Sequence, residues 1–183
     1  MTTAEDHTPR MYTITAFSEN QIGLLNRITI IFTRRRVNIS TLTVSPSAID
    51  GIHKFTIVVN DTKEKVEKVV RQIEKLVEVL RAFYHPDDEV VFQEIALYKV
   101  PTEELLRSTE LEALIREHNA RILEVTYDYT VIEKTGHGEE LQHLFEHLKS
   151  YNIRQFTRSG RVAVTKLQSE LLSDHLKVVD ENH

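Results

Sequence analysis

The alternation of apolar and polar positions between residues 12 and 44 predicts a strand, a turn, a helix and a second strand. Tyr12 to Phe17 alternates with a period of two, as a half-buried strand does. A helix is predicted from Leu24, because apolar residues recur there at helical spacing on one face: Leu24, Leu25, Ile28, Ile31 and Phe32. Ile39 to Val44 is rich in β-branched residues and predicts the next strand.

The pattern continues with a hairpin, a helix and a closing strand. Asp50-Gly51 is a hairpin signal that leads into a strand at Phe55 to Val59. Asp61 to Glu64 resembles a capping box, and the helix after it carries apolar residues at Val66, Val69, Val70, Ile73 and Leu76. Val77 to Phe83 predicts the last strand. This order, β-α-β-β-α-β, is the ferredoxin-like pattern.

The second half of the chain repeats that order. Its predicted strands are 94–100, 122–125, 129–132, 153–157 and 162–164, and its predicted helices carry Leu111, Leu114 and Ile115, then Leu141, Leu144, Phe145 and Leu148. We therefore expect an α+β fold of two tandem ferredoxin-like βαββαβ domains, at residues 11–85 and 94–166. A polar linker at 86–93 contains Pro86, a disordered arm spans 1–10, and the tail at 167–183 has the apolar spacing of a helix.

Composition narrows the function classes. The 183 residues include no cysteine, which excludes disulfides and thiolate metal sites. No apolar run approaches the roughly 20 residues of a membrane span, and the first residues lack an export signal, so we expect a cytoplasmic protein. The net charge of −5 arises in the second half and gives no support for binding to nucleic acid.

The turn before the first helix has the chemistry of an amino-acid site. A helix start presents unpaired N–H groups and the positive end of the dipole, to which a carboxylate can dock, and Gly23 lets a ligand approach the backbone. Asn20 and Asn38 offer carbonyl oxygens to an ammonium group. The alternative is purely architectural, because glycine and asparagine also serve turns and helix ends.

Three other groups have ordinary interpretations. Arg34 to Arg36 can bind phosphate or simply offset a helix dipole in solvent. Arg27, Ile30 and Arg34 form a candidate protein interface, because an apolar residue framed by arginines suits one. His143 and His147 are four residues apart and can chelate a metal, but they lie opposite the apolar helix face without a zincin glutamate. We predict no metal site and no catalytic residues.

The segment Ser18 to Arg27, followed by Arg36 to Val44, closely resembles the ACT domain of acetolactate synthase small subunits. The resemblance covers about Met11 to Thr165. Its weaker stretches are Phe55-Thr56-Ile57-Val58, Ile73-Glu74-Lys75-Leu76-Val77, Glu94 to Val100, Ile122 to Thr126 and Arg158-Ser159-Gly160-Arg161-Val162.

The resemblance implies a non-catalytic regulatory subunit. Members of that family bind a catalytic large subunit, raise its activity and confer feedback inhibition by valine or another branched-chain amino acid. This chain would then hold no cofactor, and thiamine diphosphate, Mg²⁺ and FAD would belong to the catalytic subunit. The chain would be a homodimer through its ACT domain, with Asn38 reaching the effector loop from the neighbouring chain. The implied effector residues are Asn20, Gln21, Ile22, Gly23, Leu24, Leu25, Asn38 and Ile39.

One departure and two alternatives accompany the resemblance. Many relatives have glycine at the position of Arg36, where it would end the helix in the left-handed conformation. A free-standing amino-acid sensor that controls another enzyme or a transcription factor is the main alternative function, and an enzyme in its own right is the other.

Overall fold

The computed structural model describes residues 8–167 of the chain, and these form two compact units. The first unit comprises residues 8–91 and 163–167, and the second comprises Phe92–Val162. The chain enters the second unit within β5 (Val90–Pro101) and leaves it within β9 (Val162–Thr165), and these two strands pair with each other.

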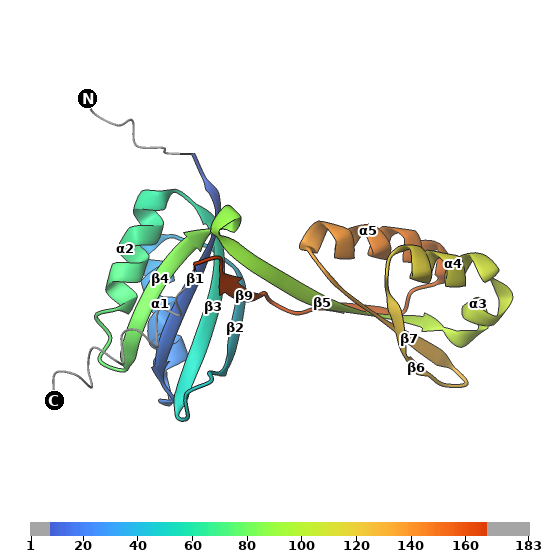
Figure 1. Ribbon diagram of the computed structural model, residues 1–183, viewed down its shortest axis with the longest axis horizontal. Helices are drawn as coiled ribbons and strands as arrows, with labels where there is room; N and C mark the ends of the chain where they lie inside the picture. The colour runs from blue at the N-terminus through green and yellow to red at the C-terminus, as the bar shows by residue number, and fades with distance from the viewer. Residues whose placement is uncertain (1–7, 168–183) are drawn as a thin grey trace. The chain divides into compact units, whose positions relative to one another are not determined.

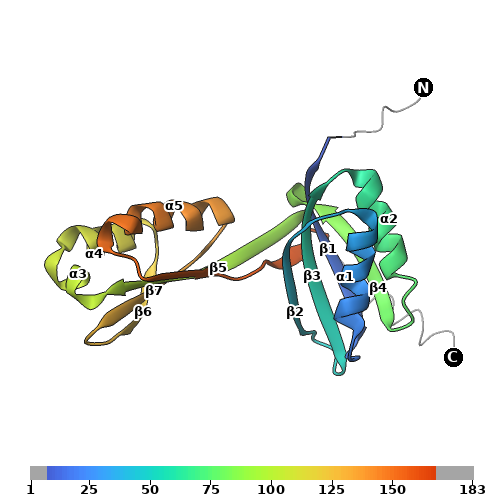
Figure 2. The ribbon, with the colours of Figure 1, turned by 180° about the vertical axis from the view of Figure 1, so that it is seen from behind.

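The first unit is a four-stranded antiparallel sheet with two helices on one face (Figures 1 and 2). The order of its strands is β2-β3-β1-β4. Its elements are β1 (Arg10–Glu19), α1 (Leu24–Arg35), β2 (Ile39–Pro46), β3 (Ile52–Asp61), α2 (Lys63–Ile73), β4 (Val79–Pro86) and a 3-10 turn, η1 (Asp87–Glu89).

The core of the first unit follows the periodicities of the sequence. Alternate residues of β1, namely Tyr12, Ile14 and Ala16, are buried against the helices. The helices contribute Leu24, Ile28 and Phe32 from α1 and Val66, Val69, Val70 and Ile73 from α2. α2 packs on β4 and β1, which leaves α1 on the β2 side of the helical layer.

Helix α1 ends in a left-handed residue although that residue is not glycine. Arg36 has φ 54° and ψ 39°, its N–H donates to Thr33 O, and the Val37 N–H donates to Phe32 O at 3.0 Å. These two hydrogen bonds are the Schellman arrangement that closes a helix. Arg36 therefore preserves the turn geometry expected of glycine.

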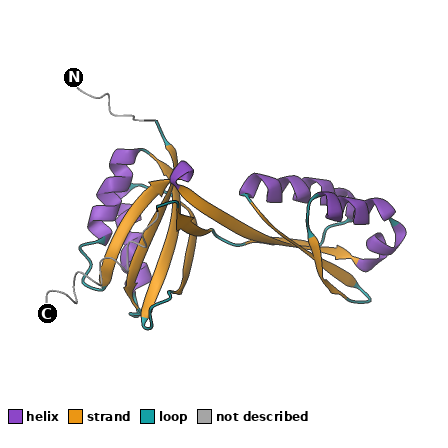
Figure 3. Ribbon diagram, viewed as in Figure 1, coloured by secondary structure: helices purple, strands orange, loops and turns teal. Residues whose placement is uncertain are grey.

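The second unit repeats the βαββαβ order, which confirms the α+β fold of two ferredoxin-like domains. Its sheet has the order β6-β7-β5-β8, and its helices lie on one side of the strands (Figure 3). Besides β5 it contains α3 (Thr102–Arg107), α4 (Thr109–Glu117), β6 (Arg121–Val125), β7 (Tyr129–Gly136), α5 (Gly138–Leu148), a 3-10 turn η2 (Lys149–Tyr151) and β8 (Gln155–Arg158). The short α3 has no counterpart in the sequence prediction.

A buried ion cluster holds the end of the second unit. Glu94 on β5 is 3.2 Å from Arg158 Nε and 3.6 Å from Arg161 Nε. Glu94 and Arg161 are both buried, and the Arg161 guanidinium lies 3.7 Å from the centre of the Phe92 ring. The Arg158 to Val162 segment, which contributed to the family resemblance, therefore has a structural role.

The structure differs from the sequence prediction at several boundaries. The predicted linker at 86–93 is instead the 3-10 turn η1 followed directly by β5, and residues 163–167 belong to the first unit. The predicted capping box at Asp61 to Glu64 is wrong: the Thr62 side chain makes no cap, and its N–H donates to Asp61 Oδ1 at 2.8 Å.

Two predicted segments fall largely outside the described residues. The tail prediction at 168–183 and the arm prediction at 1–7 lie there, while Arg10 already belongs to β1. Within residues 8–167, none of the helices has the length and apolar composition needed to cross a membrane.

Candidate functional site

The predicted effector loop lies at one end of the first unit, together with two other loops. The Glu19 N–H donates to Glu78 O at 3.0 Å, and the Asn20 N–H donates to Gly51 O at 3.3 Å. The β1–α1, β2–β3 and α2–β4 loops are therefore tied together by main-chain hydrogen bonds. Glu78 and Gly51 are distant from the loop in sequence, and no local spacing signals their contact with it.

Gly23 holds the start of α1 open to a ligand. It has φ 84°, a left-handed conformation that favours glycine, and a Cβ placed there would meet no atom within 4 Å. The Leu24 N–H donates to Gln21 O, and the Arg27 N–H donates to Gly23 O. Between them, the N–H groups of Leu25 and Asn26 have no backbone acceptor among the described residues. They are the donors available to a carboxylate.

Three apolar side chains of this loop, of the first turn of α1 and of the α2–β4 loop are not buried. Ile22 is fully exposed, Leu25 is 45% exposed, and Val77 on the neighbouring α2–β4 loop is 95% exposed. Leu24 differs, because its side chain is buried in the core. Only the main chain of Leu24 faces the site. An apolar ligand or a second chain at this end would remove Ile22, Leu25 and Val77 from water.

Asn38 and Ile39 lie at the opposite end of α1 from Gly23. The 12 residues of α1 at about 1.5 Å per residue separate the two ends by about 18 Å. One chain therefore does not bring Asn38 to Asn20 and Gly23. Two copies with antiparallel α1 helices would bring the start of each helix to the end of the other, and a two-fold axis would create two equal sites.

Strand β2 offers a surface for such an arrangement. It is an edge strand of the first sheet, and its outer side has no partner strand within residues 8–167. Val44 on β2 is 40% exposed. The Thr41 hydroxyl is buried and has no hydrogen-bond partner among the described residues. An unpaired edge of this kind is a template for pairing with another chain.

Of the three residues of the predicted partner interface, one forms an ion pair and two are exposed. Arg27 forms an ion pair with Glu78, and the hydrogen bond from Arg27 lowers the pKa of the Glu78 carboxyl. Ile30 is 39% exposed and Arg34 is exposed one helical turn further on. The interface at Arg27, Ile30 and Arg34 stays a prediction.

The second unit has a shallow hollow that contains none of the predicted effector residues. It lies on the side of the sheet away from the helices, where the Lys99 ammonium is 4.0 Å from the centre of the Tyr129 ring. Its lining consists of Leu97, Lys99, Glu124, Tyr129, Val131, Gln155 and Thr157.

Comparison with known proteins gives the same family for both units. Residues 14–81 match a family described as the AHAS small subunit-like ACT domain, and residues 93–167 match the small subunit of acetolactate synthase. The acetolactate synthase small subunit of Bacillus subtilis is 33% identical over 86% of this chain and 90% of its own length. A probable small subunit from Archaeoglobus fulgidus is 32% identical over 85% of this chain and 96% of its own length.

A solved structure has the same fold. The crystal structure of the Thermotoga maritima acetolactate synthase small subunit superposes with a TM-score of 0.78 at 26% identity, over 87% of this chain and 99% of that chain.

Proposed function

This chain belongs to the family of acetolactate synthase small subunits, and from that membership we propose that it binds the catalytic large subunit, raises its activity and makes it sensitive to valine. The observation that carries the effector part is the helix start at Gly23, with free N–H donors beside exposed apolar side chains. Catalysis would belong to the large subunit, with its thiamine diphosphate, Mg²⁺ and FAD. The cytoplasmic location stays a prediction.

The proposed effector site forms between two copies of the chain. The effector carboxylate accepts hydrogen bonds from the Leu25 and Asn26 N–H groups, and its ammonium donates to the side-chain oxygens of Asn20 and, from the other copy, Asn38. The branched side chain packs against Ile22 and Leu25. The unpaired β2 edge and the position of α1 on that side of the unit support this dimer.

Regulation would follow from the shared site. A ligand that touches both copies binds more tightly to the arrangement in which the two helix ends meet, and it shifts the population toward that arrangement by its differential affinity. The catalytic subunit would respond to that shift. A smaller regulatory effect would result if valine contacted only one copy.

A mixed dimer tests whether the site is shared. Gly23→Asp and Asn38→Ala chains, each with a different affinity tag, are co-expressed and the mixed dimer is isolated by two successive tags. Each homodimer has two damaged sites. In the mixed dimer, one site carries both changes and the other is intact. Calorimetry should therefore find about half the wild-type number of valine sites at wild-type affinity.

The opposite result is equally clear. If the site lay within one chain, both sites of the mixed dimer would be damaged and no wild-type binding would return. A chain that eluted as a monomer at micromolar concentration in the presence of valine would also contradict the proposal.

Association with the large subunit requires a separate experiment. The purified chain should form acetolactate from pyruvate at no measurable rate, and its addition should stimulate the matched catalytic subunit. Arg34→Ala should weaken the stimulation. Arg71→Ala is the matched control, because Arg71 is likewise an exposed arginine in the last turn of a helix of the same unit. Turnover by the chain alone would contradict the regulatory role, and failure to bind a large subunit would favour a free-standing sensor.

A further inference from the structure

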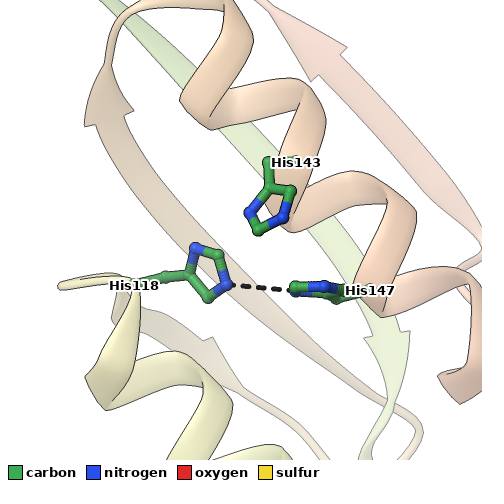
Figure 4. Close-up of side chains that lie close together, drawn as sticks. All are labelled: His118, His143 and His147. Atoms are coloured by element: carbon green, nitrogen blue, oxygen red, sulfur yellow. Dashed lines mark hydrogen bonds between the residues drawn. The ribbon is translucent and has the colours of Figure 1, made fainter.

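Three histidines from two helices meet in the second unit (Figure 4). His143 and His147 lie on one face of α5, as their spacing of four predicts. His118, at the end of α4, joins them from 25 residues away in sequence, a contact that no local spacing signals. The ring centres are separated by 4.3 Å for His143 and His147, and His118 is 5.3 Å from each of them.

The fold fixes the elements that carry these rings. Helix α4 ends in a Schellman arrangement, in which the Asn119 N–H donates to Arg116 O and the Ala120 N–H donates to Ile115 O, with Asn119 in the left-handed conformation. The Lys134 ammonium donates to His118 O at 2.7 Å. Helix α5 is anchored by three buried leucines: Leu141, Leu144 and Leu148. The imidazoles therefore project from well-anchored backbone, and those of His143 and His147 are exposed.

We propose that His118, His143 and His147 bind one divalent transition-metal ion of the class that prefers imidazole, such as zinc. One potential ligand nitrogen from each residue lies within 4.8 Å of the others, and His118 Nε2 is 3.2 Å from His147 Nδ1. Two nitrogens around a tetrahedral zinc ion are about 3.3 Å apart, given Zn–N bonds of about 2.0–2.1 Å. The observed pair already has that separation, and small rotations of the exposed rings would complete the site.

The donor set decides the class of metal. Three imidazoles favour zinc, nickel, copper or cobalt, whereas Mg²⁺ and Ca²⁺ prefer oxygen ligands. Three protein ligands leave the fourth position of a tetrahedral ion open to water or to a side chain of a partner.

Among the charged groups near the three histidines, some favour and others oppose a bound cation. Burial, followed by the neighbouring His147 and His143, lowers the pKa of His118 and so favours its neutral form. Lys134 opposes a cation, and its ammonium lies close by, at the His118 carbonyl. Glu117, next to His118, favours positive charge there.

A bound ion would join the end of α4 to α5. The rings of the two helices already meet through the 3.2 Å contact between His118 Nε2 and His147 Nδ1, and a metal at this point would act as a clamp across the helical layer. Binding to the folded state alone raises the melting temperature in proportion to the logarithm of free metal above its dissociation constant.

The test uses the full chain without a polyhistidine tag, stripped with a chelator. Calorimetry with ZnCl₂ should give one site per chain, and Zn²⁺ should raise the melting temperature. Co²⁺ should develop the intense visible absorption of a four-coordinate ion. His143→Ala and His147→Ala should each weaken zinc binding at least tenfold. Both side chains are exposed, so folding should be retained and circular dichroism would verify it.

His53→Ala is the matched control, because it removes one imidazole from the first unit. It should bind zinc as the wild-type chain does. His118→Gln should also lose binding, since one ligand of the set is removed. The proposal is overturned if wild-type zinc binding is not saturable at one ion per chain. It is equally overturned if His143→Ala and His147→Ala bind as tightly as the wild type, or if His53→Ala loses as much affinity as they do.

Discussion

Replacement of Gly23 by aspartate separates electrostatic from steric effects at the proposed effector site. The new side chain has room, because a Cβ at this position meets no atom within 4 Å. The left-handed backbone of Gly23 costs a non-glycine residue about 1–2 kcal/mol. Since α1 has no acidic residue in its first turn, an aspartate at its start regains about 0.3–1 kcal/mol from the helix dipole. The variant should therefore fold, with a net loss of stability of about 1 kcal/mol.

Its effect on valine binding should be much larger. A carboxylate about 4 Å from the effector carboxylate is repelled by about 1 kcal/mol in water and by about 4 kcal/mol at a dielectric constant near 20. The exposed Ile22 and Leu25 place this site between those limits, at about 2 kcal/mol. That corresponds to roughly a thirtyfold loss of affinity.

Gly23→Asn is the matched control for this change. Asparagine has the same shape as aspartate and tolerates the left-handed conformation equally, but it is uncharged. Calorimetric titration with valine should show a loss of only a few-fold for Gly23→Asn, with melting temperatures as the measure of folding. Equal losses for the two variants would refute the electrostatic reasoning, and wild-type affinity in both would place the effector elsewhere.

Three further changes test the architecture. Arg36→Gly removes a left-handed penalty of about 1–2 kcal/mol, partly offset by the flexibility of glycine in the unfolded chain, so scanning calorimetry should show a melting temperature about 2 °C higher. Glu78→Gln should lower the melting temperature at pH 7. Because the pKa of Glu78 is lowered in the folded chain, that difference should disappear in a pH series as acid protonates the wild-type carboxylate. Glu94→Gln leaves Arg158 and the buried Arg161 without their carboxylate and should cost about 3 kcal/mol in chemical denaturation; an unchanged midpoint would contradict a stabilising ion cluster.

The elements with a strong apolar period were predictable from sequence. α2 and α5 bury the face that their spacing indicates, because local periodicity and burial coincide there. β1 and α1 follow the prediction only in part: Thr13 and Thr15 on the other face of β1 are also buried, so the strand is not half-buried, and Leu25 of α1 is exposed. The predicted linker failed for an identifiable reason: Pro86 and three acidic residues suggested a break, but the acids occupy a single 3-10 turn. The alternation that forms β5 starts at Val90, directly after that turn.

The candidate sites, too, were predictable only where their residues form a local sequence pattern. The loop from Asn20 to Gly23 could be predicted because its residues are contiguous and its chemistry is that of a helix start. Its separation from Asn38 also follows from the length of α1. The contact of Glu78 with the loop and that of His118 with His143 could not be predicted, because contacts between segments distant in sequence leave no local pattern.

The return of the chain to the first unit has a consequence for biosynthesis. Lys54 on β3 donates to Ala163 O at 2.7 Å, and the Lys166 N–H donates to Glu89 O at 2.9 Å. Ala163 and Lys166, which supply these two groups, are translated only after the whole second unit. During synthesis on the ribosome, the first unit therefore lacks these two hydrogen bonds until residues 92–162 have been made. A nascent chain halted before Ala163 should remain more susceptible to protease in its first unit than the finished protein.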